Sequence, residues 1–189
     1  MKVSVIENSP MAMRAGISGT DYSFANALRR AATALVECFA VDTVTFYENT
    51  SAMFDEYIAE RIGLIPLLTP KGYTEKDEVV LSLEGEGPAT LYSKDMKSSD
   101  KEVKVANGNI PIIKLGDGQR LRTDCKAVLG NGKKSAKFQP GIVSYKTANG
   151  KDFEFYIESF GQMPANEIMK RALGIISSGL KDAYKELKK

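Results

Sequence analysis

Two adjacent arginines are the residues of this 189-residue chain that are best suited to specific chemistry. Arg29 and Arg30 stand in the segment FANALRRAATALVECF, which is otherwise rich in alanine and leucine. A guanidinium group presents a planar fork of donors that suits carboxylates and carbonyls. Adjacent helical residues point about 100° apart, so the two groups do not share one face. The two arginines therefore have different roles, unless both belong to an ordinary solvated helix surface.

The chain offers little for catalysis or for metal binding. It has 0 histidines, which removes the commonest general base and the commonest metal ligand. Cys38 and Cys125 are too few and too far apart for a CxxC motif or a closed zinc set, and we expect both to be buried free thiols. The acidic residues follow no spacing typical of a hydrolase. We expect no enzyme activity of the chain alone, no cofactor and no bound metal.

Composition and charge favour an ordinary globular protein. Apolar residues make up 43% of the chain, and 26 Lys and Arg against 24 Asp and Glu leave a net charge of +2. This balance gives no basic field for direct nucleic-acid binding. The N-terminal MKVSVIENSP lacks the apolar region of a signal peptide, and no run is long enough to span a membrane. A cytoplasmic protein is the expectation.

Two amphipathic helices are predicted at opposite ends of the chain. Apolar residues recur at steps of four and three in a helix of about residues 22–39, and again in a helix of about 23 residues after Pro164. The first stripe is Phe24, Leu28, Ala31, Leu35 and Cys38, and the second is Met169, Leu173, Ile176, Leu180, Ala183 and Leu187. Gly174 and Gly179 weaken the second helix unless they permit close helix packing.

The remaining segments predict mostly strands. KVSVIE and MAMRAGISG read as a hairpin, and VDTVTFYEN as a strand with Val44 and Phe46 on one face. MFDEYIAERIG predicts a short helix in which Phe54, Ile58 and Ile62 form the apolar side. Short strand-like runs broken by Gly, Asn, Asp and Pro fill residues 72 to 140, as in a compact β-rich insert.

Two striped helices over one sheet leave apolar surface that another chain would have to cover. The residues alone thus indicate a dimerising module interrupted by an insert. A self-contained α+β core remains equally compatible with the same pattern.

Six segments in order give the chain a resemblance to a known family. They are SFANALRRA at 23–31, AERIGLIPL at 59–67, GPATLYSKDM at 87–96, IPIIKLGDGQ at 110–119, AKFQPGIVSYK at 136–146 and IESFGQMPANEIMKRAL at 157–173. These segments resemble the family of archaeal DNA-directed RNA polymerase D subunits. That family of alpha-like subunits is similar to the third subunit of eukaryotic polymerases and to the N-terminal domain of the bacterial alpha subunit.

The resemblance implies an α+β fold with a discontinuous dimerisation domain, residues 1–40 and 147–189, and an insert domain, residues 41–146. In the dimerisation domain an antiparallel sheet would carry the two long helices. The resemblance further implies a heterodimer with the small subunit L and contacts with subunit N and with the large B subunit. Nucleic acid would then be met only through the assembled polymerase.

Two positions depart from the family pattern. Some members carry a cysteine-rich ferredoxin-like module after the segment that matches AKFQPGIVSYK, whereas TANGKDFEF crosses that point directly here, so no iron–sulfur cluster is expected. Ser135 stands where the family often has a histidine.

The expected function is that of a non-catalytic assembly subunit of a DNA-directed RNA polymerase, a nucleotidyltransferase complex that performs transcription. A homodimeric structural α+β protein is the alternative. The expected partner-binding residues are the stripe residues other than Cys38, together with the two arginines: Phe24, Leu28, Arg29, Arg30, Ala31, Leu35, Met169, Leu173, Ile176, Leu180, Ala183 and Leu187.

Overall fold

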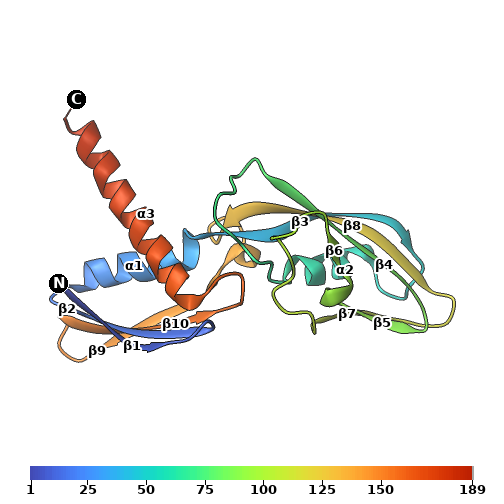
Figure 1. The fold of residues 1–189 in the computed structure, drawn as a ribbon, viewed down its shortest axis with the longest axis horizontal. Coiled ribbons are helices and arrows are strands. Elements are labelled where there is room, and N and C mark those ends of the chain that lie inside the picture. The colour runs from blue at the N-terminus through green and yellow to red at the C-terminus, as the bar shows by residue number, and fades with distance from the viewer. Residues whose placement is uncertain (189) are drawn as a thin grey trace. The chain divides into compact units, whose positions relative to one another are not determined.

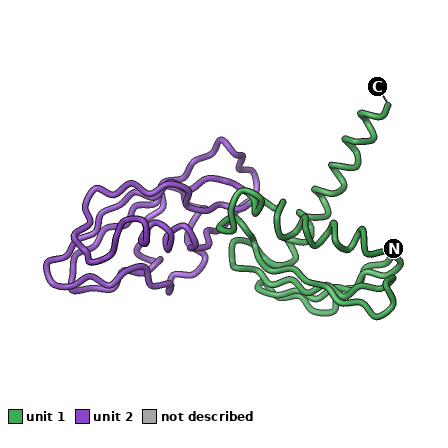
Figure 2. The backbone as a smooth tube through the Cα atoms, turned by 180° about the vertical axis from the view of Figure 1, so that it is seen from behind, with its two compact units in different colours: residues 1–37, 131–189 green, residues 38–130 purple. Residues whose placement is uncertain are grey.

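The structure, a computed structural model, describes residues 1–188 and has the predicted α+β architecture of antiparallel sheets and helices. The chain divides into two units (Figure 2). Unit 1 comprises Met1–Glu37 and the residues from Asn131 onward, and unit 2 comprises Cys38–Gly130. The β-rich insert predicted from the turn residues is confirmed, because unit 2 contains most of the strands of the chain.

Unit 1 is a four-stranded antiparallel sheet that carries two helices on one side (Figure 1). The sheet has the order β1-β2-β10-β9, from β1 (Lys2–Asn8), β2 (Ala12–Ser18), β10 (Asp152–Ser159) and β9 (Gly141–Thr147). The helices are α1 (Tyr22–Ala34) and α3 (Ala165–Glu186), and a short 3-10 turn, η2 (Ala136–Phe138), precedes β9. Alternate residues of β2 and β10 are buried on the face beneath the helices, among them Met13, Ala15, Ile17, Phe153, Phe155 and Ile157.

Unit 2 combines a four-stranded sheet, a two-stranded sheet and a short helix. The larger sheet has the order β3-β8-β4-β6, from β3 (Glu37–Asn49), β8 (Arg120–Asn131), β4 (Glu78–Glu86) and β6 (Lys97–Ser98). The smaller sheet pairs β5 (Ala89–Tyr92) with β7 (Pro111–Leu115), and a 3-10 turn, η1 (Ser93–Asp95), follows β5. Helix α2 (Asp55–Gly63) follows β3.

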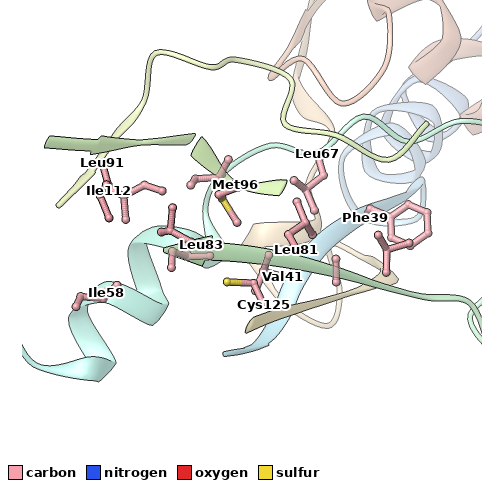
Figure 3. Packing of buried hydrophobic residues seen from close by; sticks show 14 of the residues in the cluster. Phe39, Val41, Ile58, Leu67, Leu81, Leu83, Leu91, Met96, Ile112 and Cys125 are labelled. Carbon is pink, nitrogen blue, oxygen red and sulfur yellow. The ribbon is translucent and has the colours of Figure 1, made fainter. Parts of the chain in front are cut away.

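The core of unit 2 is one cluster of aliphatic and aromatic side chains between α2 and the strands (Figure 3). Ile58 from α2, Leu81 and Leu83 from β4 and Ile112 from β7 are all fully or nearly fully buried in it. Arg61 fastens α2 to β7, because its guanidinium donates to the backbone carbonyls of Ile112 at 2.8 Å and Pro111 at 2.7 Å. As predicted, Val44 and Phe46 pack against this cluster from one face of β3.

The first long helix is shorter than its apolar period suggests. Asp21 caps α1 by accepting a hydrogen bond from the backbone N–H of Phe24 at 2.9 Å, but the helix ends at Ala34 instead of near residue 39. Cys38, predicted as part of the helical stripe, lies on the buried start of β3. The run from Val36 to Val41 contains aromatic and β-branched residues that suit a buried strand, so sheet pairing overrides the helical period there.

The two units meet at 37/38 and 130/131, whereas the domain boundaries predicted from the resemblance lie at 40/41 and 146/147. The second pair of values differs because β9 pairs with β10 from Gly141 to Thr147 and so belongs to unit 1. Another expectation is corrected by the structure. Phe54, predicted on the apolar side of the short helix, lies at its N-cap and is 70% exposed. In addition, the KEVKV run predicted as a strand makes only an isolated bridge, between Val105 and Leu67.

Both thiols should be inert in the folded chain. Cys38 and Cys125 are buried and form no disulfide within residues 1–188, and burial raises the pKa of the Cys125 thiol to about 11. Because only the thiolate is nucleophilic, we expect no modification of either cysteine by iodoacetamide at about pH 8, and complete modification in denaturant. Mass spectrometry of the chain and of a Cys38→Ala variant, which reports on Cys125 alone, checks this. Rapid labelling of the native Cys38→Ala variant would contradict it.

Candidate partner-binding surface

Helix α1 uses its apolar stripe inside its own unit. Ala25, Leu28, Ala31 and Ala32 are all buried, because α1 packs against α3 and β9. Leu28 and Ala31, expected to bind a partner, therefore have no exposed surface to offer one. Phe24 and Leu35 are half-buried at the two ends of the stripe.

Helix α3 is covered only over its first half. Ala165, Ile168, Met169 and Ala172 are buried against the sheet and α1, and Leu173 and Ile176 are half-buried. From Ser177 to Lys188 every residue is exposed, including Ala183. The largest apolar side chains there are Leu180 at 68%, Tyr184 at 61% and Leu187 at 87% exposure. Within unit 1, this second half rises away from the sheet (Figure 1).

Little within the chain stabilises the second half of α3 as a helix. Its side-chain contacts include the solvent-exposed ion pair of Lys185 with Asp182 at 3.4 Å, and pairs of this kind stabilise a helix by at most ~0.5 kcal/mol. A Cβ added at Gly174 or Gly179 would meet no atom within 4 Å, so no packing inside the chain requires these glycines. A helical segment of about a dozen residues is marginal in water without tertiary packing. The exposed half-helix thus has the properties of a surface that a second chain completes.

Strand β1 adds exposed apolar residues to this face of unit 1. Val3 pairs with Ile17 and Val5 with Ala15, and paired residues of an antiparallel sheet lie on the same face. Ile17 and Ala15 are buried beneath the helices, whereas Val3 and Val5 are 61% and 60% exposed. The helices pack mainly on β9, β10 and β2, which leaves this edge of the face uncovered. The alternation in KVSVIE predicted a strand correctly but carried no signal for what covers it.

Arg29 and Arg30 are the clearest candidates for polar contacts with a partner. Arg29 is half-buried and Arg30 is exposed, and neither guanidinium has an ion pair or hydrogen bond with any side chain or carbonyl in residues 1–188. Other arginines of unit 1 are paired: Arg14 with Glu154, and Arg171 with Glu167 at 3.3 Å. Arg29 and Arg30 therefore differ from the other arginines of unit 1, because their guanidinium donors have no partner within residues 1–188.

The opposite face of the unit 1 sheet carries a polar network. The carboxylate of Glu154 accepts hydrogen bonds from Arg14 and pairs with Lys146 at 3.1 Å. Both contacts lower the pKa of Glu154, and the contact with Arg14 has the larger effect. An open hollow of about 590 Å³ beside it is lined in part by Ser144 and Tyr156. Its charged groups are thus largely engaged with one another.

The described residues contain neither a metal cluster nor a membrane-spanning helix. Across residues 1–188, no three His, Cys, Asp or Glu side chains lie together in a way that would hold a metal ion. No helix in this range combines the length and the hydropathy that crossing a bilayer requires.

The chain matches known proteins over most of its length. Residues 34–143 match the family described as the RNA polymerase Rpb3/RpoA insert domain. A protein of Methanocaldococcus jannaschii named DNA-directed RNA polymerase subunit Rpo3 is 44% identical over 165 residues, which cover 87% of this chain and 85% of that protein.

Longer relatives carry the same name. Those of Thermococcus kodakarensis and Pyrococcus furiosus are each 50% identical over 153 residues. The match covers 77% of this chain but only 59% of each relative, so the chain spans little more than half the length of these proteins.

Proposed function

Because the chain belongs to the Rpb3/RpoA family of DNA-directed RNA polymerase subunits, we propose that it is a non-catalytic assembly subunit of such a polymerase. Its role is to hold other subunits in place during assembly for transcription, and it carries out no chemistry itself. The observation that carries this proposal is the exposed second half of α3, whose apolar residues have no cover within the chain.

The first partner is a small subunit of the L type, which forms a heterodimer through unit 1. Its apolar surface would cover Leu180, Tyr184 and Leu187 on α3, and Val3 and Val5 at the edge of the sheet. Fully burying such side chains is worth roughly 1.5–3 kcal/mol each, before the cost of association is subtracted.

Gly179 fits this arrangement. It lies two helical turns beyond the buried Ala172 and so on the same side of α3. A glycine there lets a partner helix approach the backbone closely, which would offset the lower helix propensity that glycine brings.

The other partners dock on the preformed heterodimer. Arg29 and Arg30 supply charge-assisted hydrogen bonds to the large B subunit, and subunit N contacts the chain as the family resemblance implies. The chain then meets nucleic acid only through the assembled polymerase, in the cytoplasm.

A charged residue at position 180 should prevent the heterodimer without unfolding the chain. Leu180 is 68% exposed, so Leu180→Asp should change the stability of the isolated chain by less than ~0.5 kcal/mol. In the heterodimer the same carboxylate would be buried without a partner, at a cost of several kcal/mol. We therefore expect that tagged Leu180→Asp chain recovers little of a co-expressed small subunit in a pull-down.

Lys181→Asp is the matched control, because it adds negative charge at the adjacent exposed position, about 100° around the helix. It should recover the small subunit at close to the wild-type yield. Leu28→Asp is unsuitable, since Leu28 is fully buried within unit 1 and its loss would unfold the chain. Equal recovery with Leu180→Asp and wild type would contradict the proposed interface, and a discrete homodimer of the chain alone in light scattering would favour the homodimeric alternative.

Removing the arginines should weaken docking of the large subunit while leaving the heterodimer intact. Alanine is at least as good a helix former as arginine, so Arg29→Ala and Arg30→Ala should hardly change the melting temperature. Losing one side of a desolvated charge contact costs ~2–5 kcal/mol, which weakens docking at least tenfold. The measurement is a titration of preformed heterodimer with the large subunit, for each single and the double variant.

Lys151→Ala serves as the control in this titration, because it removes an exposed cation of unit 1 from a turn outside α1. Unchanged affinity of the folded double variant would assign both arginines to ordinary solvated surface.

A further inference from the structure

Helix α2 in unit 2 exposes a second apolar side that its own core does not use. Ile58 and Ile62 are fully buried, whereas Phe54, Tyr57 and Leu64 are 70%, 65% and 59% exposed. The exposed three are spaced by three and seven residues, which places them along one side of the helix and its two ends. We call these three residues the α2 ridge.

Two aromatic rings of the α2 ridge lie against each other. The rings of Phe54 and Tyr57 lie with their centroids 6.3 Å apart and their planes tilted by 32°. Arg61 lies between Tyr57 and Leu64 in the sequence, but its guanidinium is engaged by the carbonyls of Pro111 and Ile112. Arg61, the cation nearest the ridge in the sequence, therefore already has hydrogen-bond partners that hold α2 to β7. Large exposed side chains grouped in this way are typical of protein-binding surfaces, where aromatic residues are enriched.

Acidic residues flank the α2 ridge. Glu56 and Glu60 are exposed and four residues apart, so they form one row beside Tyr57. Neither carboxylate has an ion pair or hydrogen-bond partner in the part of the chain that the structure describes, residues 1–188. Two other exposed glutamates of unit 2 do form ion pairs, Glu78 with Lys126 at 2.6 Å and Glu86 with Arg120 at 3.0 Å.

The charge of this flank decides which kind of partner fits. Phosphate groups of nucleic acids and of anionic lipids would be repelled by Glu56 and Glu60, whereas lysine or arginine side chains would be attracted. An apolar ridge beside an unpaired acidic row is complementary to a segment that carries both apolar and basic side chains.

We propose that the α2 ridge and its acidic row are a docking site for a basic segment of another protein chain. Apolar side chains of that segment cover Phe54, Tyr57 and Leu64, and its lysines or arginines pair with Glu56 and Glu60. The site lies in unit 2 and depends neither on the α3 surface nor on the contacts of Arg29 and Arg30.

Site-specific photo-crosslinking tests this directly. The full chain is produced in cells with p-benzoylphenylalanine in place of Tyr57, irradiated, and its crosslinked peptides are identified by mass spectrometry. We expect one predominant peptide from another protein, with a net positive charge and apolar residues at the crosslink. The same substitution at Leu64 should capture the same peptide.

Charge reversal separates specific docking from incidental proximity. Glu56→Lys combined with Glu60→Lys should reduce the crosslink yield by about tenfold, since two attractive contacts become repulsive. The matched control is Glu75→Lys with Asp117→Lys, two exposed acids of unit 2 outside α2, which should leave the yield unchanged. Thermal denaturation verifies that all variants are folded.

Four outcomes would overturn the proposal: no protein crosslink from either position, an acidic or uncharged peptide as the main product, crosslinking to nucleic acid or lipid, or a yield that charge reversal leaves unchanged.

Discussion

The chain can bury only the first half of α3 against its own sheet. Up to Ala172 the helix packs on the sheet and α1, and beyond Ser177 every residue to Lys188 is exposed. A continuous apolar stripe nevertheless runs through both halves. Apolar side chains in water and a weakly supported half-helix both raise the free energy of the isolated chain. The proposed assembly role follows from this imbalance, because a second chain that covers the stripe would relieve both costs.

Much of the architecture could be predicted from residue periodicity. Alternation in KVSVIE and the following turn identified the β1-β2 hairpin, and β-branched and aromatic runs broken by turn residues identified strands of unit 2. Steps of three and four identified α1, α2 and α3. The residues at which helices and strands end were harder to predict. The period of α1 continues to Cys38, yet the chain leaves the helix after Ala34 because the next residues are buried in a strand. The position of β9 was also missed, since only its pairing with β10 assigns it to unit 1.

The candidate surface was harder to predict than the fold. Periodicity tells which residues share a face, but it cannot tell whether that face is covered by the same chain. Leu28 and Leu180 occupy equivalent positions in their stripes, and one is 0% exposed while the other is 68% exposed. Val3 was predicted in the correct strand without a signal for its exposure, and Phe54, predicted on the apolar side of the short helix, is exposed at its N-cap. Such signals arise only from tertiary packing.

Hydrogen–deuterium exchange of the backbone amides shows whether another chain completes the second half of α3. Amides from Ser177 to Glu186 should exchange rapidly in the isolated chain, because few contacts oppose local opening of the exposed half-helix. In a reconstituted complex with the small subunit the same amides should become strongly protected. Amides of the buried first half, around Ile168 and Ala172, should be protected in both samples. Equal exchange from Ser177 to Glu186 with and without the small subunit would contradict the account.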